Sequence, residues 1–285
     1  FIIQKYSKTD LFFGANVFNH VDDLVNFLES IKKIISNHVI VNRLRVISVF
    51  KGFRRIESKP PFPDPKDISS KLENFIPPDL LGESDWLPAI ELFGEGVFFS
   101  FDEKILSLWE AQPSVINRAK DISNRYELSQ IVDGPIEITP RFILLHTLSH
   151  LIIRELEISS GFRAASLQER IFSNVEKQMA GVLIYTAVAD MVGSLGGIIQ
   201  SAEPQEFLKI LLNAFNQSEW CSLDPVCSEH SGQGLDKLNG AACHACALTP
   251  ERSCGFKNVL LDRTFIKGSQ KLEIPSFLDF INEYE

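Results

Sequence analysis

Residues 139–161 read TPRFILLHTLSHLIIRELEISSG, and they predict a long helix that is buried on nearly every side. Thr139 can cap the helix with its hydroxyl, and proline is tolerated at the first helical position, here Pro140. The Ser-Ser-Gly sequence that ends at Gly161 predicts the end of the helix. Most positions in between are apolar, and a helix that is apolar all round is typical of a protein core.

His146 and His150 interrupt this apolar surface. A spacing of four residues puts both histidines on one helix face, which Arg154 and Glu157 extend. The segment HTLSH has the histidine spacing of a zinc protease but lacks the glutamate that such an enzyme needs, so a metalloprotease is not expected. Two interpretations remain open: a pair of hydrogen-bonded core histidines, or an internal polar site with a function.

Further helices are predicted on both sides of this stretch. Helical periodicity is found in residues 22–36, 104–125 (with a break near Pro113) and 204–217. Ser166 and Glu169 have the spacing of a helix capping box.

Strands are predicted where β-branched and aromatic residues gather. Such composition is found in residues 39–50, 86–101 and 181–189. In residues 86–101 the Gly-Glu-Gly sequence predicts a turn between two strands.

All five cysteines lie in the last quarter of the chain. The CHAC segment puts Cys243 and Cys246 on one tight turn, and clustered thiols with a C-x-x-C core are the usual ligands of a tetrahedral zinc ion. We predict that Cys227 and Cys254 complete the site, with Cys221 as the alternative ligand. Four protein ligands close the coordination sphere, so the prediction is one structural zinc.

Other interpretations of the thiols remain open. His230 and His244 are weaker candidate ligands. The cysteines can also be buried free thiols, or the C-x-x-C can be a redox motif, although no thioredoxin-like pattern precedes it. Thiols grouped at metal spacing fit a reducing cytoplasm better than a disulfide scaffold, so we expect a cytoplasmic protein.

Together these signals predict a mixed α/β (α+β) fold, in which strands and helices form one body with a small zinc-stapled C-terminal element. The predicted parts are an N-terminal α/β region with a basic strand, residues 1–138; a helix-strand-helix core region, residues 139–218; and a cysteine-rich zinc-binding element with a C-terminal tail, residues 219–285. No apolar run approaches the ~20 residues that span a bilayer, so no membrane partner is expected.

The chain of 285 residues has a net charge of −9, which excludes bulk attraction to nucleic acid. Residues 43–59 nevertheless hold six basic residues and one acidic residue, so a local patch is a candidate nucleic-acid contact. Its residues are Arg43, Arg45, Lys51, Arg54, Arg55 and Lys59. The alternative is a solvated strand edge, where basic residues oppose aggregation. Residues 219–263 hold six acidic and four basic residues, which argues against a zinc finger that grips phosphates.

No G-x-x-x-x-G-K-[ST] motif is present, so no NTPase site is expected. An enzymatic alternative rests on polar residues in apolar or glycine-rich surroundings, a setting that perturbs pKa values. If they converge on one pocket, they can act on a nucleic-acid phosphodiester. These residues are His146, His150, Glu169, Arg170 and Asp190.

Several motifs together resemble the DrmB family of the DISARM anti-phage system, and the cysteine-rich domain of unknown function shared with MrfA-type DNA-repair helicases. The motifs, in chain order, are RLRVISVFKGFRRIE from Arg43, DWLPAIELFGEGVFF from Asp85, TPRFILLHTLSHLIIREL from Thr139, SLQERIF from Ser166, GSLGG from Gly193, WCSLDPVC from Trp220, LNGAACHACALTPERSC from Leu238 and LDR from Leu261. The resemblance covers about residues 40–265. Met191 and Val192 depart from the family, which tends to have an acidic residue before GSLGG.

The resemblance implies a bacterial cytoplasmic protein that binds zinc through four cysteines and works beside a DNA helicase or translocase. It also implies that this chain, which begins with Phe1, is a C-terminal portion or a shortened member of the family. The leading hypothesis is therefore a non-catalytic zinc-binding subunit or module that helps a helicase engage DNA in anti-phage defence. The alternatives are the phosphodiester-acting enzyme and a purely structural protein-docking module.

Overall fold

The computed structural model describes residues 21–54, 75–76, 78–79, 82, 85–129, 136–161, 163–186 and 197–283. Contacts divide the chain into two compact units: unit 1, Phe1–Leu44 with Gly94–Glu285, and unit 2, Arg45–Phe93. The three-part division at residues 138 and 218 stays a prediction. The chain combines helices with a four-stranded sheet and a C-terminal group of cysteines, so the mixed α/β fold class is confirmed.

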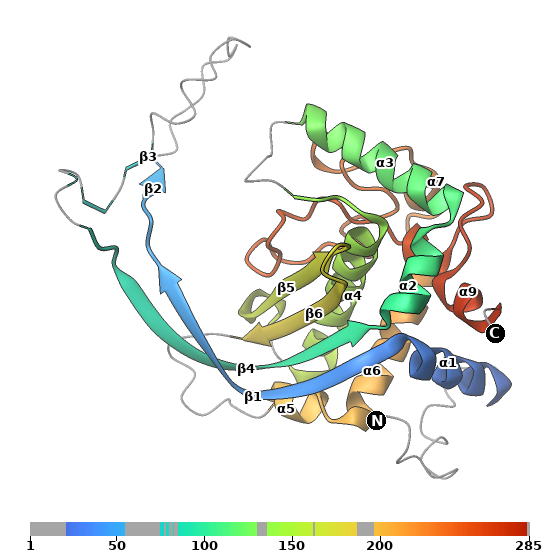
Figure 1. The fold of residues 1–285 in the computed structure, drawn as a ribbon, viewed down its shortest axis with the longest axis horizontal. Coiled ribbons are helices and arrows are strands. Elements are labelled where there is room, and N and C mark those ends of the chain that lie inside the picture. Colours follow the sequence, from blue (N-terminus) through green and yellow to red (C-terminus); the bar gives the residue numbers. More distant parts are fainter. Residues whose placement is uncertain are drawn as a thin grey trace. The chain divides into compact units, whose positions relative to one another are not determined.

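Helix α4 (Pro140–Ser160) lies at the centre of unit 1 (Figure 1). The Thr139 hydroxyl accepts a hydrogen bond of 3.3 Å from the Phe142 N–H, and Gly161 ends the helix in the left-handed conformation, as the sequence predicts. Residues 141–153 are all buried, because the helix contacts elements on several sides. Its neighbours include α3 (Pro113–Leu128), α5 (Gly197–Ser201), α6 (Pro204–Glu219), α8 (Thr264–Lys267), β5 (Leu167–Asn174) and β6 (Met179–Thr186).

The sheet of four strands has the order β1-β4-β6-β5. The strands are β1 (Ile35–Val49), β4 (Ala89–Phe101), β5 (Leu167–Asn174) and β6 (Met179–Thr186). Strand β6 pairs antiparallel with β4 and with β5 (Figure 1). The strand predicted at residues 39–50 is confirmed by β1, and the strand predicted at residues 181–189 is confirmed up to Thr186, beyond which residues 187–189 lie outside the described residues. Strands β5 and β6 form a hairpin that α4 contacts.

The predicted turn between two strands in residues 86–101 is wrong, because β4 is continuous there. Gly96 lies opposite Tyr185 of β6, and a Cβ at Gly96 would be 2.6 Å from the Ile184 carbonyl oxygen. Glu95 is buried and accepts a hydrogen bond of 2.8 Å from the Ile198 N–H at the start of α5. The Gly-Glu-Gly sequence thus reflects close strand packing and a buried carboxylate rather than a turn.

The predicted capping box at Ser166 and Glu169 is also wrong. A short 3-10 helix (Ala164–Ser166) leads into β5, and no helix follows. The Glu169 carboxylate instead accepts a hydrogen bond from the Ser149 hydroxyl of α4. The Glu169 side chain therefore bonds to α4 instead of capping a local helix.

The remaining helices pack around α4 and the sheet. Their bounds are α1 (Val21–Ile34), α2 (Glu103–Glu110), α3 (Pro113–Leu128), α5 (Gly197–Ser201), α6 (Pro204–Glu219), α7 (Val226–Glu229), α8 (Thr264–Lys267) and α9 (Phe277–Glu283). The helices predicted in residues 22–36, 104–125 and 204–217, with a break near Pro113, are confirmed. Buried Arg141 joins α4 to α2, because it pairs with Glu103 and Glu110 of α2.

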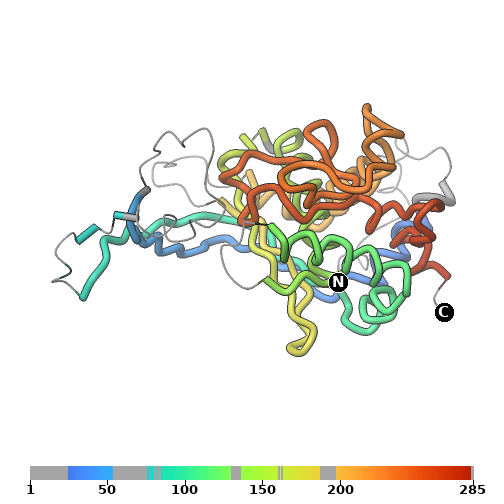
Figure 2. Tube along the Cα trace, turned by 90° about the horizontal axis from the view of Figure 1, so that it is seen from above, coloured from blue at the N-terminus to red at the C-terminus, as the bar shows by residue number. Residues whose placement is uncertain are grey.

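After α6 the chain follows an irregular path with short helices, drawn in orange and red in Figure 2. It includes a second 3-10 helix, Leu235–Lys237. Its small core is separate from the main core and is formed by Cys221, Cys227, Ala242, Cys246, Ala247 and Leu261. A core of so few apolar side chains contributes little to the free energy of folding, and segments of this kind usually need a bound metal or disulfides as well.

Unit 2 contains residues 45–49 of β1, residues 89–93 of β4, and a short antiparallel pair of β2 (Phe53–Arg54) with β3 (Phe75–Ile76). In the described part of the chain, no helix is long and apolar enough to cross a membrane.

Candidate metal centre

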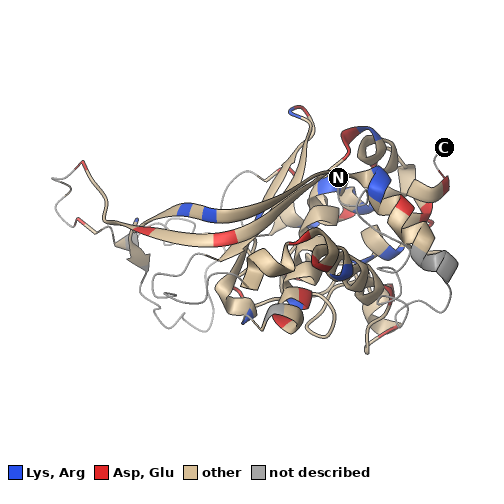
Figure 3. Ribbon diagram, turned by 90° about the horizontal axis from the view of Figure 1, so that it is seen from below, with Lys and Arg blue, Asp and Glu red and all other residues tan. Residues whose placement is uncertain are grey.

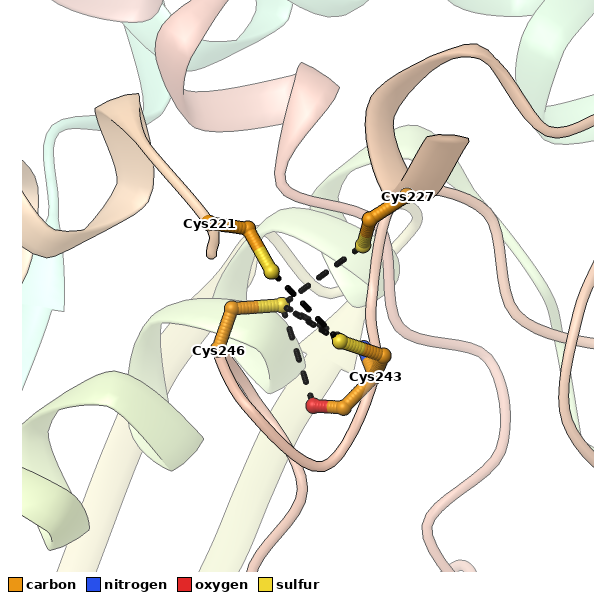
Figure 4. A group of neighbouring side chains, drawn as sticks. All are labelled: Cys221, Cys227, Cys243 and Cys246. Atoms are coloured by element: carbon orange, nitrogen blue, oxygen red, sulfur yellow. Dashed lines mark hydrogen bonds between the residues drawn. The ribbon is translucent and has the colours of Figure 1, made fainter. Parts of the chain in front are cut away.

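Cys221, Cys227, Cys243 and Cys246 form a compact group of thiols, here called the cysteine tetrad. Their sulfur atoms point toward one another from three segments (Figure 4). Cys221 follows α6, Cys227 lies in α7, and the other two lie on a turn closed by hydrogen bonds from the Cys246 and Ala247 N–H groups to the Cys243 carbonyl. The four Sγ atoms lie within 4.8 Å of one another.

The distances between the sulfur atoms fit a zinc ion and not disulfides. They are 3.5 Å for Cys221–Cys243, 3.7 Å for Cys243–Cys246 and 3.8 Å for Cys227–Cys246. A disulfide requires about 2.05 Å. Four sulfurs placed about 2.3 Å from a central zinc lie about 3.8 Å apart. The tetrad therefore has the size and donor chemistry of a tetrahedral zinc site.

Nearby N–H groups are arranged to stabilise thiolates. The Leu223 N–H donates to Cys221 Sγ at 3.4 Å, and the Cys243 N–H donates to Cys246 Sγ at 3.3 Å. The guanidinium of Arg263 is fully buried, and its Nη2 lies 3.7 Å from Cys227 Sγ. Four thiolates and one zinc ion carry two negative charges together, and this arginine offsets part of that charge.

The Cys227 and Cys246 thiols lie in hydrogen-bond contact, with their Sγ atoms 3.8 Å apart. Hydrogen bonding to Cys246, aided by Gln233 and Arg263, outweighs burial and lowers the pKa of the Cys227 thiol to about 5. The same contact raises the pKa of Cys246, which keeps the proton. The contact therefore favours the thiolate form of Cys227, which is the form that binds a metal.

The tetrad differs from the set predicted from the sequence. It contains Cys221, the predicted alternative, in place of Cys254. Cys254 lies on a different loop and faces α4, where its Sγ is 3.3 Å from His146 Nε2. Sequence spacing cannot separate these two cysteines, because it does not fix the path of the chain that connects each of them to the CHAC turn. His244, a weaker candidate, is exposed and outside the tetrad.

The polar stripe of α4 faces this cysteine-rich segment. Arg154 donates hydrogen bonds of 3.1 Å to the carbonyls of Ala245 and Leu248, so it holds the CHAC turn from outside. One turn earlier, His150 Nδ1 lies 2.9 Å from the Ala247 carbonyl oxygen. The stripe seen in the sequence thus positions the turn that carries two ligands.

A second group of polar side chains lies nearby and consists of His146, His150, Glu169 and Cys254. Glu169 Oε1 is 3.1 Å from His146 Nε2 and 3.4 Å from His150 Nε2. The side chains of both histidines and Glu169 have no exposed surface. The structure thus brings together three residues of the predicted polar site and adds Cys254.

The four side chains of this second group shift one another's pKa values. Burial alone would lower the pKa of both histidines, but Glu169 raises the pKa of His146 to about 10 and that of His150 to about 9. Burial would raise the pKa of Glu169, but the two imidazoles hold it well below its usual range. For Cys254, burial is outweighed by His146, which lowers the thiol pKa to about 7.

Two other residues of the predicted polar site do not join this group. Arg170 is exposed on the opposite face of β5 from Glu169, because side chains alternate along a strand, and its guanidinium lies 5.9 Å from the centre of the Phe172 ring. Asp190 and most of the GSLGG segment lie outside the described residues.

The candidate nucleic-acid patch lies on and after β1. Arg43, Arg45 and Lys51 are exposed, and Arg45 forms an ion pair with Glu91 of β4. Figure 3 shows basic and acidic residues on these paired strands, so the surface has mixed charge. The backbone of Arg54 lies in β2, whereas Arg55 and Lys59 lie outside the described residues.

Comparisons with known proteins agree with the metal centre. Residues 148–247 match the model of the MrfA Zn-binding domain family, and this range contains all four cysteines of the tetrad. The chain is also 34% identical over 259 residues to the DISARM protein DrmB of Bacillus paralicheniformis (strain ATCC 9945a / NCIMB 11709 / CD-2). This alignment covers 89% of the chain and 43% of that DrmB, so the chain spans less than half the length of this relative. The chain is DrmB-like and carries an MrfA-type zinc-binding domain whose cysteine tetrad fits one structural zinc.

Proposed function

We propose, from the premise of a DrmB-like chain with an MrfA-type zinc-binding domain, that it is a non-catalytic module in anti-phage defence. It associates with a DNA helicase or translocase and helps that enzyme engage DNA. The observation that carries this proposal is the 34% identity to a DISARM protein along 89% of the chain. The grouped thiols favour a reducing compartment, and we place the protein in the cytoplasm.

Burial of the histidine group favours a non-catalytic role over the phosphodiester-acting alternative. His146 and His150 have no exposed surface, and the Glu169 side chain has none either. A nucleic-acid phosphate cannot reach these groups in this conformation, and a catalytic acid or base must come within hydrogen-bond reach of its substrate.

The helicase association is tested by co-purification. The DrmB-like protein is expressed with a helicase or translocase subunit encoded beside it, and each is tagged in turn. Recovery of a stoichiometric complex supports the proposal. A protein that elutes separately from the enzyme at physiological salt, in both tag arrangements, contradicts it.

The DNA contact is tested on the purified complex with a charge-reversed patch. Changing Arg43, Arg45 and Lys51 to Glu should weaken DNA binding and reduce its salt dependence, because each phosphate contact contributes to counterion release. The matched control reverses three exposed lysines elsewhere: Lys32, Lys177 and Lys209. Equal DNA binding by both triple variants would remove the patch from the proposal.

A second candidate, protein docking through unit 2, is favoured by the exposed apolar side chains of that unit. Trp86 is 69% exposed and Ile47 is 56% exposed, and Phe50, Phe53 and Ile90 are also exposed. Such surfaces often mark protein contacts. Changing Trp86 and Phe50 to Ser should then abolish the complex with the helicase, whereas the charge reversal should not.

A further inference from the structure

We propose that His146, His150, Glu169 and Cys254 form a second zinc site, separate from the cysteine tetrad. Each residue offers one ligand atom, and these four atoms lie within 4.8 Å of one another. The ligands come from α4, from β5 and from the loop before α8, so the site would join three segments. This inference does not depend on the proposed helicase or DNA partner.

The distances between the ligand atoms have the size of a zinc tetrahedron. His146 Nε2 lies 3.1 Å from Glu169 Oε1 and 3.3 Å from Cys254 Sγ, and His150 Nε2 lies 3.4 Å from Glu169 Oε1. A zinc ion bound at about 2.0–2.1 Å by nitrogen and oxygen, and at about 2.3 Å by sulfur, requires edges of about 3.3–3.6 Å. The separations of 3.3 and 3.4 Å fall within this range, and that of 3.1 Å is slightly shorter.

Two of these ligand atoms, His150 Nε2 and Glu169 Oε1, are buried and have no well-aligned hydrogen bond within the described ranges. Glu169 Oε1 nevertheless lies 3.1 Å from His146 Nε2 and 3.4 Å from His150 Nε2. Buried polar atoms are nearly always satisfied, and each unsatisfied one calls for an explanation such as an ion. A zinc ion between these atoms would satisfy both at once.

The surroundings prepare each ligand for a metal. The Ala247 carbonyl lies 2.9 Å from His150 Nδ1, which places the proton there and leaves the Nε2 lone pair free. The Ser149 hydroxyl donates to Glu169 Oε2, which leaves Oε1 as the ligand atom. Such outer hydrogen bonds typically orient metal ligands.

The Cys254 sulfur accepts hydrogen bonds from backbone N–H groups, as metal-bound thiolates commonly do. The Phe256 and Asn258 N–H groups both donate to its Sγ at 3.3 Å. In the tetrad, Cys221 accepts from the residue two positions later in the same way, through Leu223. The shared N–H···S pattern links the fifth cysteine to the four whose zinc site the family comparison supports.

The His146 ring is fixed by packing. The centres of the Phe142 and Phe256 rings lie 5.5 and 5.0 Å from it. The Nδ1 atom of His146 has no hydrogen-bond partner in the part of the chain that the structure describes. The orientation of the ring is therefore set by these packing contacts.

The charges of the four ligands balance a divalent ion. Two neutral imidazoles, one carboxylate and one thiolate carry two negative charges, which Zn²⁺ cancels. Four protein ligands and a buried position indicate a structural ion that fastens the cysteine-rich segment to α4 and β5.

The decisive measurement uses the 285-residue chain purified without chelators. Elemental analysis should find about two zinc ions per chain. X-ray absorption at the zinc edge should give an average of about 2.5 sulfur and about 1.5 nitrogen or oxygen ligands per ion, the mean of the two ligand sets. This experiment needs no variant, so it holds even if the substitutions impair folding.

Two substitutions identify the second site. Cys254→Ser or Glu169→Gln should each reduce the content to about one zinc with an all-sulfur ligand shell. The matched control, His244→Ala, changes an exposed histidine of the CHAC turn and should retain two. One zinc with only sulfur ligands in the unsubstituted chain would overturn the proposal. Unchanged zinc content in both Cys254→Ser and Glu169→Gln would also overturn it.

Discussion

The Nδ1 atom of His150 lies 2.9 Å from the carbonyl oxygen of Ala247, the residue that follows the tetrad ligand Cys246. This hydrogen bond joins the central helix to the metal-binding turn. Ala247 also donates its N–H to the Cys243 carbonyl at 2.9 Å, so the turn is held from inside and from α4. Folding of the cysteine-rich segment and packing of α4 should therefore depend on each other.

Loss of a tetrad ligand should unfold the cysteine-rich segment. Cys246→Ser removes one of the four thiols, and structural zinc contributes about 10–16 kcal/mol of apparent free energy in small zinc domains. The small core around the tetrad cannot replace that contribution. We expect loss of the tetrad zinc and rapid proteolysis within residues 220–263, measured by elemental analysis and limited trypsin digestion. His244→Ala serves as the control, and protease resistance equal to this control would contradict the prediction.

The ion pair between Arg118 of α3 and Asp262 is buried, with a distance of 2.7 Å from Nε to Oδ2. Asp262 Oδ1 also accepts hydrogen bonds from the N–H groups of Ala241 and Thr264, both at 3.0 Å. Asp262→Ala leaves the guanidinium buried without its partner, which should cost about 3–5 kcal/mol of unfolding free energy. Denaturant titration measures this cost.

The exposed pair between Arg45 and Glu91 is the comparison for that measurement. Glu91→Ala should cost only about 0–1 kcal/mol, because solvent screens the charges. Similar losses for Asp262→Ala and Glu91→Ala would show that the buried pair does not anchor the C-terminal segment.

Gly96 of β4 should resist even a small side chain. A Cβ there would be 2.6 Å from the Ile184 carbonyl oxygen, so Gly96→Ala must push β4 and β6 apart. We expect a loss of about 1–3 kcal/mol in the free energy of unfolding, which is typical of overpacking. Gly255→Ala is the control, because nothing lies within 4 Å of its Cβ position. Equal stability of the two variants in thermal unfolding would contradict the prediction.

Glu155 of α4 should make stability depend on pH. Burial raises its pKa, and this outweighs the hydrogen bonds from Asn213 and Gln217 that lower it. Between the pKa of the unfolded chain, about 4.3, and the raised pKa of the folded chain, the folded state binds more protons. The contribution of Glu155 to stability therefore decreases as the pH rises through this window.

Glu155→Gln keeps a side chain that can bond to Gln217 but removes this titration. The Tm of the variant should rise relative to that of the unsubstituted chain as the pH increases from 5 to 8. Parallel Tm profiles for the two proteins over that range would contradict the assignment.

The sequence predicted α4 correctly but did not predict β5. Helix α4 was predictable because its cap, its apolar positions and its terminal glycine all indicate the same structure. Strand β5 was not predicted, because Ser166 and Glu169 match a local capping pattern. In the structure Glu169 bonds to Ser149, which is 20 residues earlier in the chain, and local spacing contains no record of that contact.

Residue type and short-range spacing were enough to predict a buried α4 with a polar stripe and a group of thiols that suits zinc. They could not predict how the five cysteines divide, with Cys221 in the tetrad and Cys254 beside His146. That division depends on which ligand atoms converge within a few ångströms in the folded chain. Cys254 and His146 are 108 residues apart, and they meet because the C-terminal segment packs against α4.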